Sequence, residues 1–178
     1  MKRLLIITAC VGVAAAAAFG VTLQTAYDKC GPGDGYDKLL VLDSKVTYTG
    51  GCGVLMYKKS CIRGNGALIN LDGESIGAGQ YGTELTVEEC CLINAGYYGA
   101  ISIQDSASVV ANGNSICKSN GVAAIYVWIG SSGTLKNNVI YGSKNYGIAK
   151  HQSTGTLNIL YNDVDACSGG NYMYFCPG

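Results

Sequence analysis

Short stretches in which apolar and polar residues alternate run along the chain from about residue 45 onward. Ile101-Ser102-Ile103-Gln104 is typical, with two aliphatic side chains on one face and two polar side chains on the other. A period of two residues is the pattern of a β-strand. No amphipathic helical stretch of useful length follows the first twenty residues. The pattern therefore predicts an all-β protein built from many short strands.

A repeat of about 24 residues organises these strands. The repeating segments are CLINAGYYGAISI from Cys91, NSICKSNGVAAIYV from Asn114, NVIYGSKNYGIAK from Asn138 and NDVDACSGGNYMY from Asn162, with starts 23, 24 and 24 residues apart. An earlier segment from Cys61 fits the later part of the pattern. Glycine density excludes a helical repeat, and neither a sandwich nor an up-and-down barrel requires this period. Stacked coils of three short parallel strands bury the apolar side of each coil against its neighbours.

The N-x-[ILV] and G-[IAV]-x-[IV] patterns of these segments resemble the right-handed parallel β-helix repeat family, the pectate-lyase-like superfamily. The resemblance covers about residues 45–176 and implies an all-β, right-handed parallel β-helix of about six short coils. We expect a signal peptide at 1–20, an N-terminal cap or lead-in at 21–44 and the β-helix at 45–178. The polygalacturonase motifs Asn-Thr-Asp, Asp-Asp, Gly-His-Gly and Arg-Ile-Lys are missing. No catalytic residue of the family transfers to this chain, so the resemblance implies architecture and not activity.

The N-terminus has the form of a secretory signal peptide. Lys2 and Arg3 precede an uncharged stretch from Leu4 to Phe19, and Ala18-Phe19-Gly20 has the small residues of a cleavage site. The competing interpretation is a retained membrane anchor, but the stretch is short and half of it is alanine. We expect a protein that is secreted or displayed at the cell surface, with no membrane contact after cleavage.

The charge content limits the partners. The chain carries 12 basic and 12 acidic residues, and charged residues make up only 13% of it. A nucleic-acid-binding protein needs clustered lysine and arginine to displace phosphate counterions. Disorder needs high charge and low hydrophobicity. The composition thus argues against both, and no nucleic-acid partner is expected.

Eight cysteines remain after the signal segment, which contains Cys10. An even number in an exported chain is compatible with disulfides, and the alternative is a set of buried thiols. We expect at least one disulfide near an end of the stack, either Cys30–Cys52 or Cys167–Cys176. Cys61 and Cys117 are expected at one inward position two coils apart, as buried thiols. No CxxC pair supports zinc, no motif supports calcium, and we expect no cofactor.

A corner of the coil is expected to carry a column of Cys91, Asn114, Asn138 and Asn162. Asparagine tolerates left-handed backbone geometry, and its amide can bond to the coils above and below. Such a ladder is structural, although asparagine is common in sugar-binding sites.

A candidate binding face follows from aligning Ile69, Ile101, Ile125 and Ile148. Alternation then places one row of side chains outward, and a second row follows two residues later. The first row is Asn70, Ser102, Tyr126 and Ala149; the second is Asp72, Gln104, Trp128 and His151. Lys150 falls in the inward phase, which requires either a slip of register or an amine that reaches outward.

Aromatic and polar side chains at the spacing of adjacent coils, about 4.8 Å, suit an extended glycan. We therefore predict a carbohydrate-binding strip of Asp72, Gln104, Tyr126, Trp128 and His151, with a polysaccharide or cell-surface glycan as partner. The competing interpretation is that tyrosine and tryptophan only pack across strands of an exposed sheet.

Catalysis has weaker candidates in Asp72, Asp105 and His151. Two carboxylates separated by about 5 to 9.5 Å hydrolyse glycosides. Asp72 and Asp105 would be that close if they lay on neighbouring coils, and His151 is a candidate general base. The alternative, that all three are solvated surface groups, is preferred.

Three functions remain open from the sequence. The leading hypothesis is an exported β-helix domain that binds carbohydrate outside the cell. The second is a small polysaccharide lyase or glycoside hydrolase of pectate-lyase-like fold. The third is a structural surface module or a fragment of a longer β-helix protein.

Overall fold

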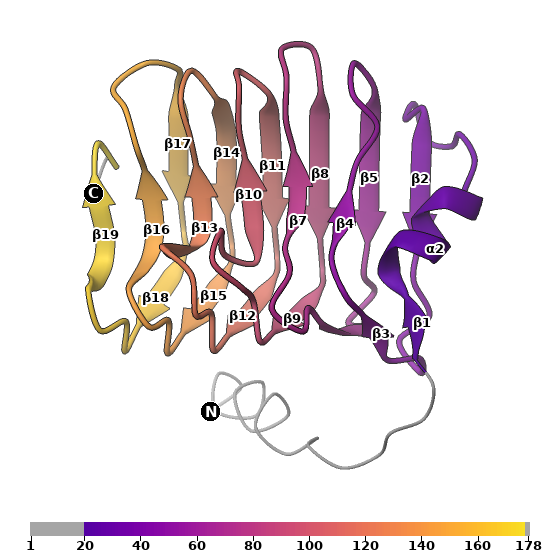
Figure 1. Cartoon of the computed structure of the whole chain (residues 1–178), viewed down its shortest axis with the longest axis horizontal. Helices are drawn as coiled ribbons and strands as arrows, with labels where there is room; N and C mark the ends of the chain where they lie inside the picture. The colour runs from indigo at the N-terminus through magenta and orange to yellow at the C-terminus, as the bar shows by residue number, and fades with distance from the viewer. Residues whose placement is uncertain (1–19, 177–178) are drawn as a thin grey trace.

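The protein is a parallel β-solenoid of about six turns (Figure 1). The structure, a computed structural model, describes residues 20–176. The prediction of an all-β protein with stacked parallel strands is confirmed. The predicted signal peptide, apart from Gly20, lies outside the described residues.

Three parallel sheets run along the axis of the stack, and each full turn contributes one strand to each of them. Sheet I contains β1 (Val21–Thr22), β3 (Tyr48–Thr49), β6 (Leu68–Asn70), β9 (Cys91–Ile93), β12 (Ser115–Cys117), β15 (Val139–Tyr141) and β18 (Asp163–Asp165). Sheet II contains β4 (Cys52–Gly53), β7 (Ile76–Ala78), β10 (Ile101–Ile103), β13 (Ala123–Val127), β16 (Tyr146–Lys150) and β19 (Gly170–Tyr174). Sheet III contains β2 (Lys38–Val41), β5 (Lys59–Arg63), β8 (Glu84–Glu88), β11 (Ser108–Asn112), β14 (Ser132–Lys136) and β17 (Leu157–Leu160).

The core lies inside the three sheets, where each turn places aliphatic side chains on those of the next turn. In sheet II the pairing aligns Ile76, Ile101, Ile125 and Ile148, all fully buried. Stacking identical side chains at the strand spacing lets each turn cover the apolar face that it cannot cover alone. The alternation seen in the sequence therefore corresponds to an inside and an outside of the solenoid.

The corner between sheets III and I carries the predicted asparagine ladder. Asn138 Oδ1 accepts hydrogen bonds from the backbone N–H of Asn114 at 3.1 Å and from its Nδ2 at 3.0 Å. Asn162 Oδ1 serves Asn138 in the same way, at 3.0 and 2.8 Å. Asn114 and Asn138 are fully buried, so the ladder pairs polar groups that would otherwise be unsatisfied in the core.

Two details of the ladder differ from the expectation. The column continues to Cys90, whose N–H donates to Asn114 Oδ1 at 3.0 Å, and not to Cys91, which pairs with Ser115. The left-handed backbone belongs to the preceding residue of each turn, for example Asn137 at φ 56°. The asparagines are chosen for their amides and not for their backbone conformation.

A short helix that alternation alone did not predict, α2 (Leu23–Lys29), lies at the N-terminal end of the stack (Figure 1). It buries Leu23 and Tyr27 and contacts β1, β2 and β4. The side chain of Lys38 donates to the carbonyl oxygens at its C-terminal end, including that of Cys30 at 2.6 Å, which matches the negative end of the helix dipole. Strands β1 and β2 already pair with the sheets, and a capping role for residues 21–44 stays a prediction.

Candidate functional site

The strand register separates Asp72 from the rest of the predicted strip. Ile101 of β10 pairs with Ile76 of β7, whereas Ile69 lies on sheet I and pairs with Leu92. The expected alignment of Ile69 with Ile101 is therefore wrong. Asp72 is exposed in the loop 71–75 that precedes β7, at the opposite end of the sheet II strands from the loops that follow them.

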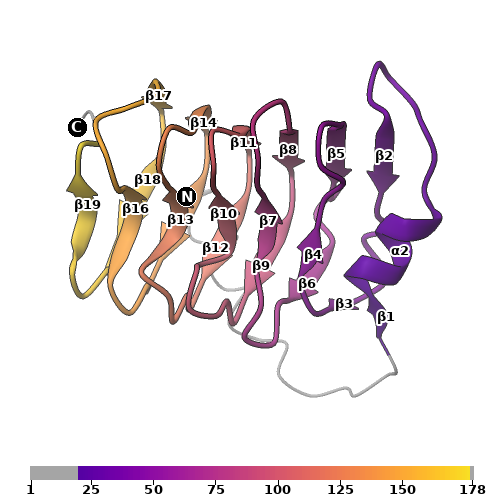
Figure 2. The same cartoon turned by 45° about the horizontal axis from the view of Figure 1, so that its top comes forward.

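The other four predicted contact residues do come together on sheet II. Gln104, Trp128 and His151 each follow their strands directly, and the backbone bonds Trp128 N–Ile103 O and His151 N–Val127 O hold them on consecutive turns. Gly79, and not Asp72, occupies the position next to Gln104, because Ala78 pairs with Ile103. Figure 2 shows the strands β7, β10, β13 and β16 that carry this row side by side.

Tyr126 sits below this row and is buried, with only 2% of its surface exposed. It points away from the main core and forms a second small apolar cluster with Ala123 and Ala149. Trp128, Tyr146, Met173 and Val122 pack against that cluster. The outward direction predicted for Tyr126 therefore holds, but the side chain supports its neighbours and does not offer a free surface.

Trp128 and His151 form the exposed part of the aromatic group. Their rings are stacked, with centroids 4.8 Å apart and planes 6° from parallel. Tyr126 meets the Trp128 ring edge-on at 5.1 Å. Stacked and edge-on aromatic contacts fix the orientation of both rings. Because the stack runs from turn to turn, His151 covers one face of the indole and Gln104 lies on the side of the other face.

The predicted pair of carboxylates is not formed. Asp105 is exposed in the loop 104–107 after β10, whereas Asp72 lies before β7, so the whole width of sheet II separates them. Asp105 instead lies near Gly79: a Cβ added there would be 3.9 Å from its carboxylate oxygen. Lys150 keeps the inward register, pairing with Val127, and its Nζ donates to the carbonyl oxygen of Gly155 at 2.6 Å.

Neither expected disulfide is formed. Cys30, Cys52, Cys167 and Cys176 are all thiols in the structure, and no disulfide occurs among the cysteines that it describes. Cys52 is 2% exposed, and burial raises the pKa of its thiol from 9.0 to about 12. The terminal cysteines therefore contribute apolar packing here.

Cys61 and Cys117 are both buried, as expected, but they do not share a position. Cys61 is on β5 of sheet III and pairs with Thr86, whereas Cys117 is on β12 of sheet I and pairs with Ile93. The two residues therefore lie on different faces of the solenoid. The error has the same origin as the misplacement of Ile69, because both come from the register of the N-terminal turns.

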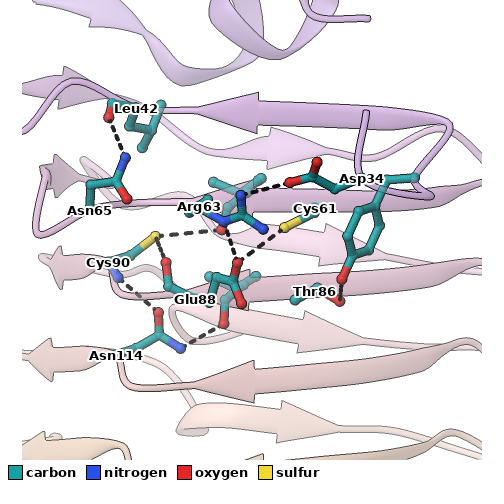
Figure 3. A network of polar contacts seen from close by, with 12 residues as sticks. Asp34, Leu42, Cys61, Arg63, Asn65, Thr86, Glu88, Cys90 and Asn114 are labelled. Atoms are coloured by element: carbon teal, nitrogen blue, oxygen red, sulfur yellow. Dashed lines mark hydrogen bonds and ion pairs between the residues drawn. The ribbon is translucent and has the colours of Figure 1, made fainter. Parts of the chain in front are cut away.

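A polar network that the sequence did not point to covers Cys61 (Figure 3). Arg63 Nε donates to Glu88 Oε1 at 2.6 Å, and its Nη1 donates to Asp34 Oδ2 at 3.0 Å. Cys61 Sγ lies 3.8 Å from the same Glu88 oxygen. Burial, followed by the charge of Glu88, raises the pKa of the Cys61 thiol to about 12. The network fastens the loop before β2 onto strands β5 and β8, and it stabilises the fold.

Comparisons with known proteins give no further assignment. A scan against protein-family models finds no match, and searches of curated proteins and of solved structures find none either. Within residues 20–176 no group of three or more histidine, cysteine or acidic side chains is arranged to hold a metal ion. No helix in the described part of the chain is long and apolar enough to span a membrane. The class that the fold defines is the parallel β-solenoid.

Proposed function

We propose that this protein is an exported solenoid of the pectate-lyase-like type that binds polysaccharide on the outer face of sheet II. The observation that carries the proposal is the group of Tyr126, Trp128 and His151, which lies outside the core and orients a half-buried indole on an exposed sheet. A rigid indole next to an amide and an imidazole offers an apolar plane for a sugar face and hydrogen-bonding groups for its hydroxyls.

The residues have different roles in this proposal. Trp128 and Gln104 make the contact, His151 contacts the ligand and holds the indole, and Tyr126 supports both rings from below. Asp72 drops out of the strip because of its place in the loop before β7. Export is supported by the charged start at Lys2 and Arg3 and by the uncharged stretch that follows it.

No observation favours the lyase or hydrolase alternative, because Asp72 and Asp105 lie at opposite ends of the sheet II strands. The structural-module alternative is the one that a binding experiment must separate from the proposal. A glycan array with the mature protein makes that separation: retention of at least one polysaccharide supports binding, and a blank array favours a structural module.

The site is tested with Trp128→Ala in calorimetric titrations of the polysaccharide that the array retains. We expect affinity to fall by about 1 to 3 kcal/mol, as for other aromatic anchors. Tyr141→Ala, at an outward and exposed position of sheet I, is the matched control and should bind as the wild type does. Equal affinity of the wild type and Trp128→Ala would move the site elsewhere.

A further inference from the structure

The outer face of sheet II loses its side chains on the N-terminal side of Trp128. The outward positions of β4 and β7 are Gly53 and Gly77, which pair in register with each other, and Gly77 pairs with Ser102 of β10. Gly79 follows β7 at the position next to Gln104. We call Gly53, Gly77 and Gly79 the glycine strip.

Nothing within the chain requires glycine at these positions. None of the three has a left-handed φ. A Cβ at Gly53 would meet no atom within 4 Å, and a Cβ at Gly77 would meet only the carbonyl oxygen of Ser102, at 3.7 Å. Glycine inside a strand weakens it, and it often marks a place where a ligand or another backbone approaches closely. Since no part of this chain makes that approach, an external partner is the remaining reason.

Side chains border the strip on several sides. Tyr126 and Trp128 stand at its C-terminal end. Beside it, Tyr57 and Tyr81 are 67% and 80% exposed on the loops that follow β4 and β7. The Tyr57 ring lies against the second loop, where a Cβ added at Gly82 would come within 3.7 Å of its Cδ1. The strip is thus a flat backbone surface with aromatic rings along one side and at one end.

The face is almost free of charge. Among the described residues, no lysine or arginine occupies an outward position of sheet II from β4 to β16, and the amine of Lys150 is turned inside onto the Gly155 carbonyl. Asp105 is the charged group nearest the strip. An anionic ligand such as a polyuronate would find no cation here and would meet a carboxylate, which disfavours it.

We propose that the glycine strip seats a chain of neutral sugars that lies along the solenoid axis and ends against the open face of Trp128. This inference rests on the proposed function and adds the class of ligand and its direction. From β4 to β16 there are four strand steps of about 4.8 Å, and a pyranose unit spans about one step. The strip and the aromatic group therefore take about four sugar units.

The test fills the strip without touching the aromatic group. Gly77→Val adds a β-branched side chain at an open strand position, which favours the strand. Gly31→Val is the matched control, because Gly31 also has open space and no left-handed φ but lies in the loop before β2. The probes are neutral hexasaccharides of glucose, mannose and xylose, and hexagalacturonate, titrated in a calorimeter. Thermal unfolding of each variant checks the fold, and Gly53→Val serves as the second filling variant.

We expect at least one neutral hexasaccharide to bind, with affinity about tenfold or more lower in Gly77→Val or Gly53→Val and unchanged in Gly31→Val. Shorter oligosaccharides should lose affinity below about four units. Binding that survives in both filled variants, or a preference for hexagalacturonate, would overturn the inference. If Trp128→Ala removes that surviving binding, the proposed function stands without the strip; if no glycan binds the wild type at all, both fail.

Discussion

The indole of Trp128 and the imidazole of His151 lie face to face, with ring centroids 4.8 Å apart and planes 6° from parallel. The contact follows from the register, since Val127 pairs with Lys150 and the next residue of each strand is therefore a neighbour across turns. The spacing of the turns sets the distance between the rings. A solenoid with this repeat thus builds an aromatic stack without any long-range loop.

His151→Ala should release the indole from its stacking partner. Trp128 is the only tryptophan, so the intrinsic fluorescence reports on this site alone. We expect a red shift of its emission, because the uncovered face meets water, and a loss of about 1 kcal/mol in the free energy of unfolding. Gln152→Ala, at the next residue, is the control. An unchanged emission maximum in His151→Ala would show that the stack does not exist in solution.

Asn138→Ala should destabilise the protein strongly. The substitution removes the acceptor for the buried N–H of Asn114 and the donor to the Ala111 carbonyl oxygen. Leaving two such groups unsatisfied costs about 2 to 5 kcal/mol. Urea unfolding monitored by circular dichroism measures the loss.

Asn158→Ala is the control for the ladder, because Asn158 points outward on β17 and is exposed. Its effect should stay within about 0.5 kcal/mol. Equal destabilisation by both substitutions would mean that the ladder contributes no more than a surface amide.

The ladder also explains which part of the fold the sequence could predict. From Asn114 onward each turn carries an asparagine at the same corner, so the spacing of 24 residues places every later strand correctly. The preceding turns have Cys90 and Ala67 at this corner. Without the marker, a shift by one strand still aligns aliphatic residues, and Ile69 takes the place of Ile76.

The candidate site shows a different limit. Alternation gives the direction of a side chain but not what covers it, so the burial of Tyr126 under its neighbours needed the structure. The glycine strip was out of reach for the same reason as Ile76, because Gly53 and Gly77 reach the outer face of sheet II only in the correct register. Glycine at every outward position of a strand is a signal that a corrected alignment would reveal.

Stability should fall in alkaline solution through the buried thiols. Burial, with a smaller effect of Asp28, raises the pKa of Cys52 from 9.0 to about 12. Between these values the unfolded chain loses the thiol proton while the folded protein keeps it. The free energy of unfolding should therefore decrease by about 1.4 kcal/mol per pH unit for this group, with the contribution complete below pH 9.

Urea unfolding of the wild type and of Cys52→Ala at pH 8 to 11, under reducing conditions, isolates this contribution. Other groups titrate equally in both proteins, so the difference between the two curves belongs to Cys52. We expect the variant to lose less stability as the pH rises. Parallel curves would contradict a neutral buried thiol at this position.

Arg63 should control access to Cys61. Its guanidinium joins Glu88 on β8 to Asp34 in the loop 31–37, and the loop also carries Tyr36, whose hydroxyl donates to Thr86 at 3.4 Å. In Arg63→Gln the charged link is lost, so the loop should open more often and expose the thiol. We expect maleimide to label Cys61 about tenfold faster, as read by peptide mass spectrometry. Lys59→Gln is the matched control, because the Lys59–Glu84 pair is exposed and its atoms are 3.8 Å apart. Cys90, fully buried in the core, is the internal reference. An unchanged rate at Cys61 would contradict the link, and an equal rise at Cys90 would mean that the substitution loosens the whole solenoid and not the loop.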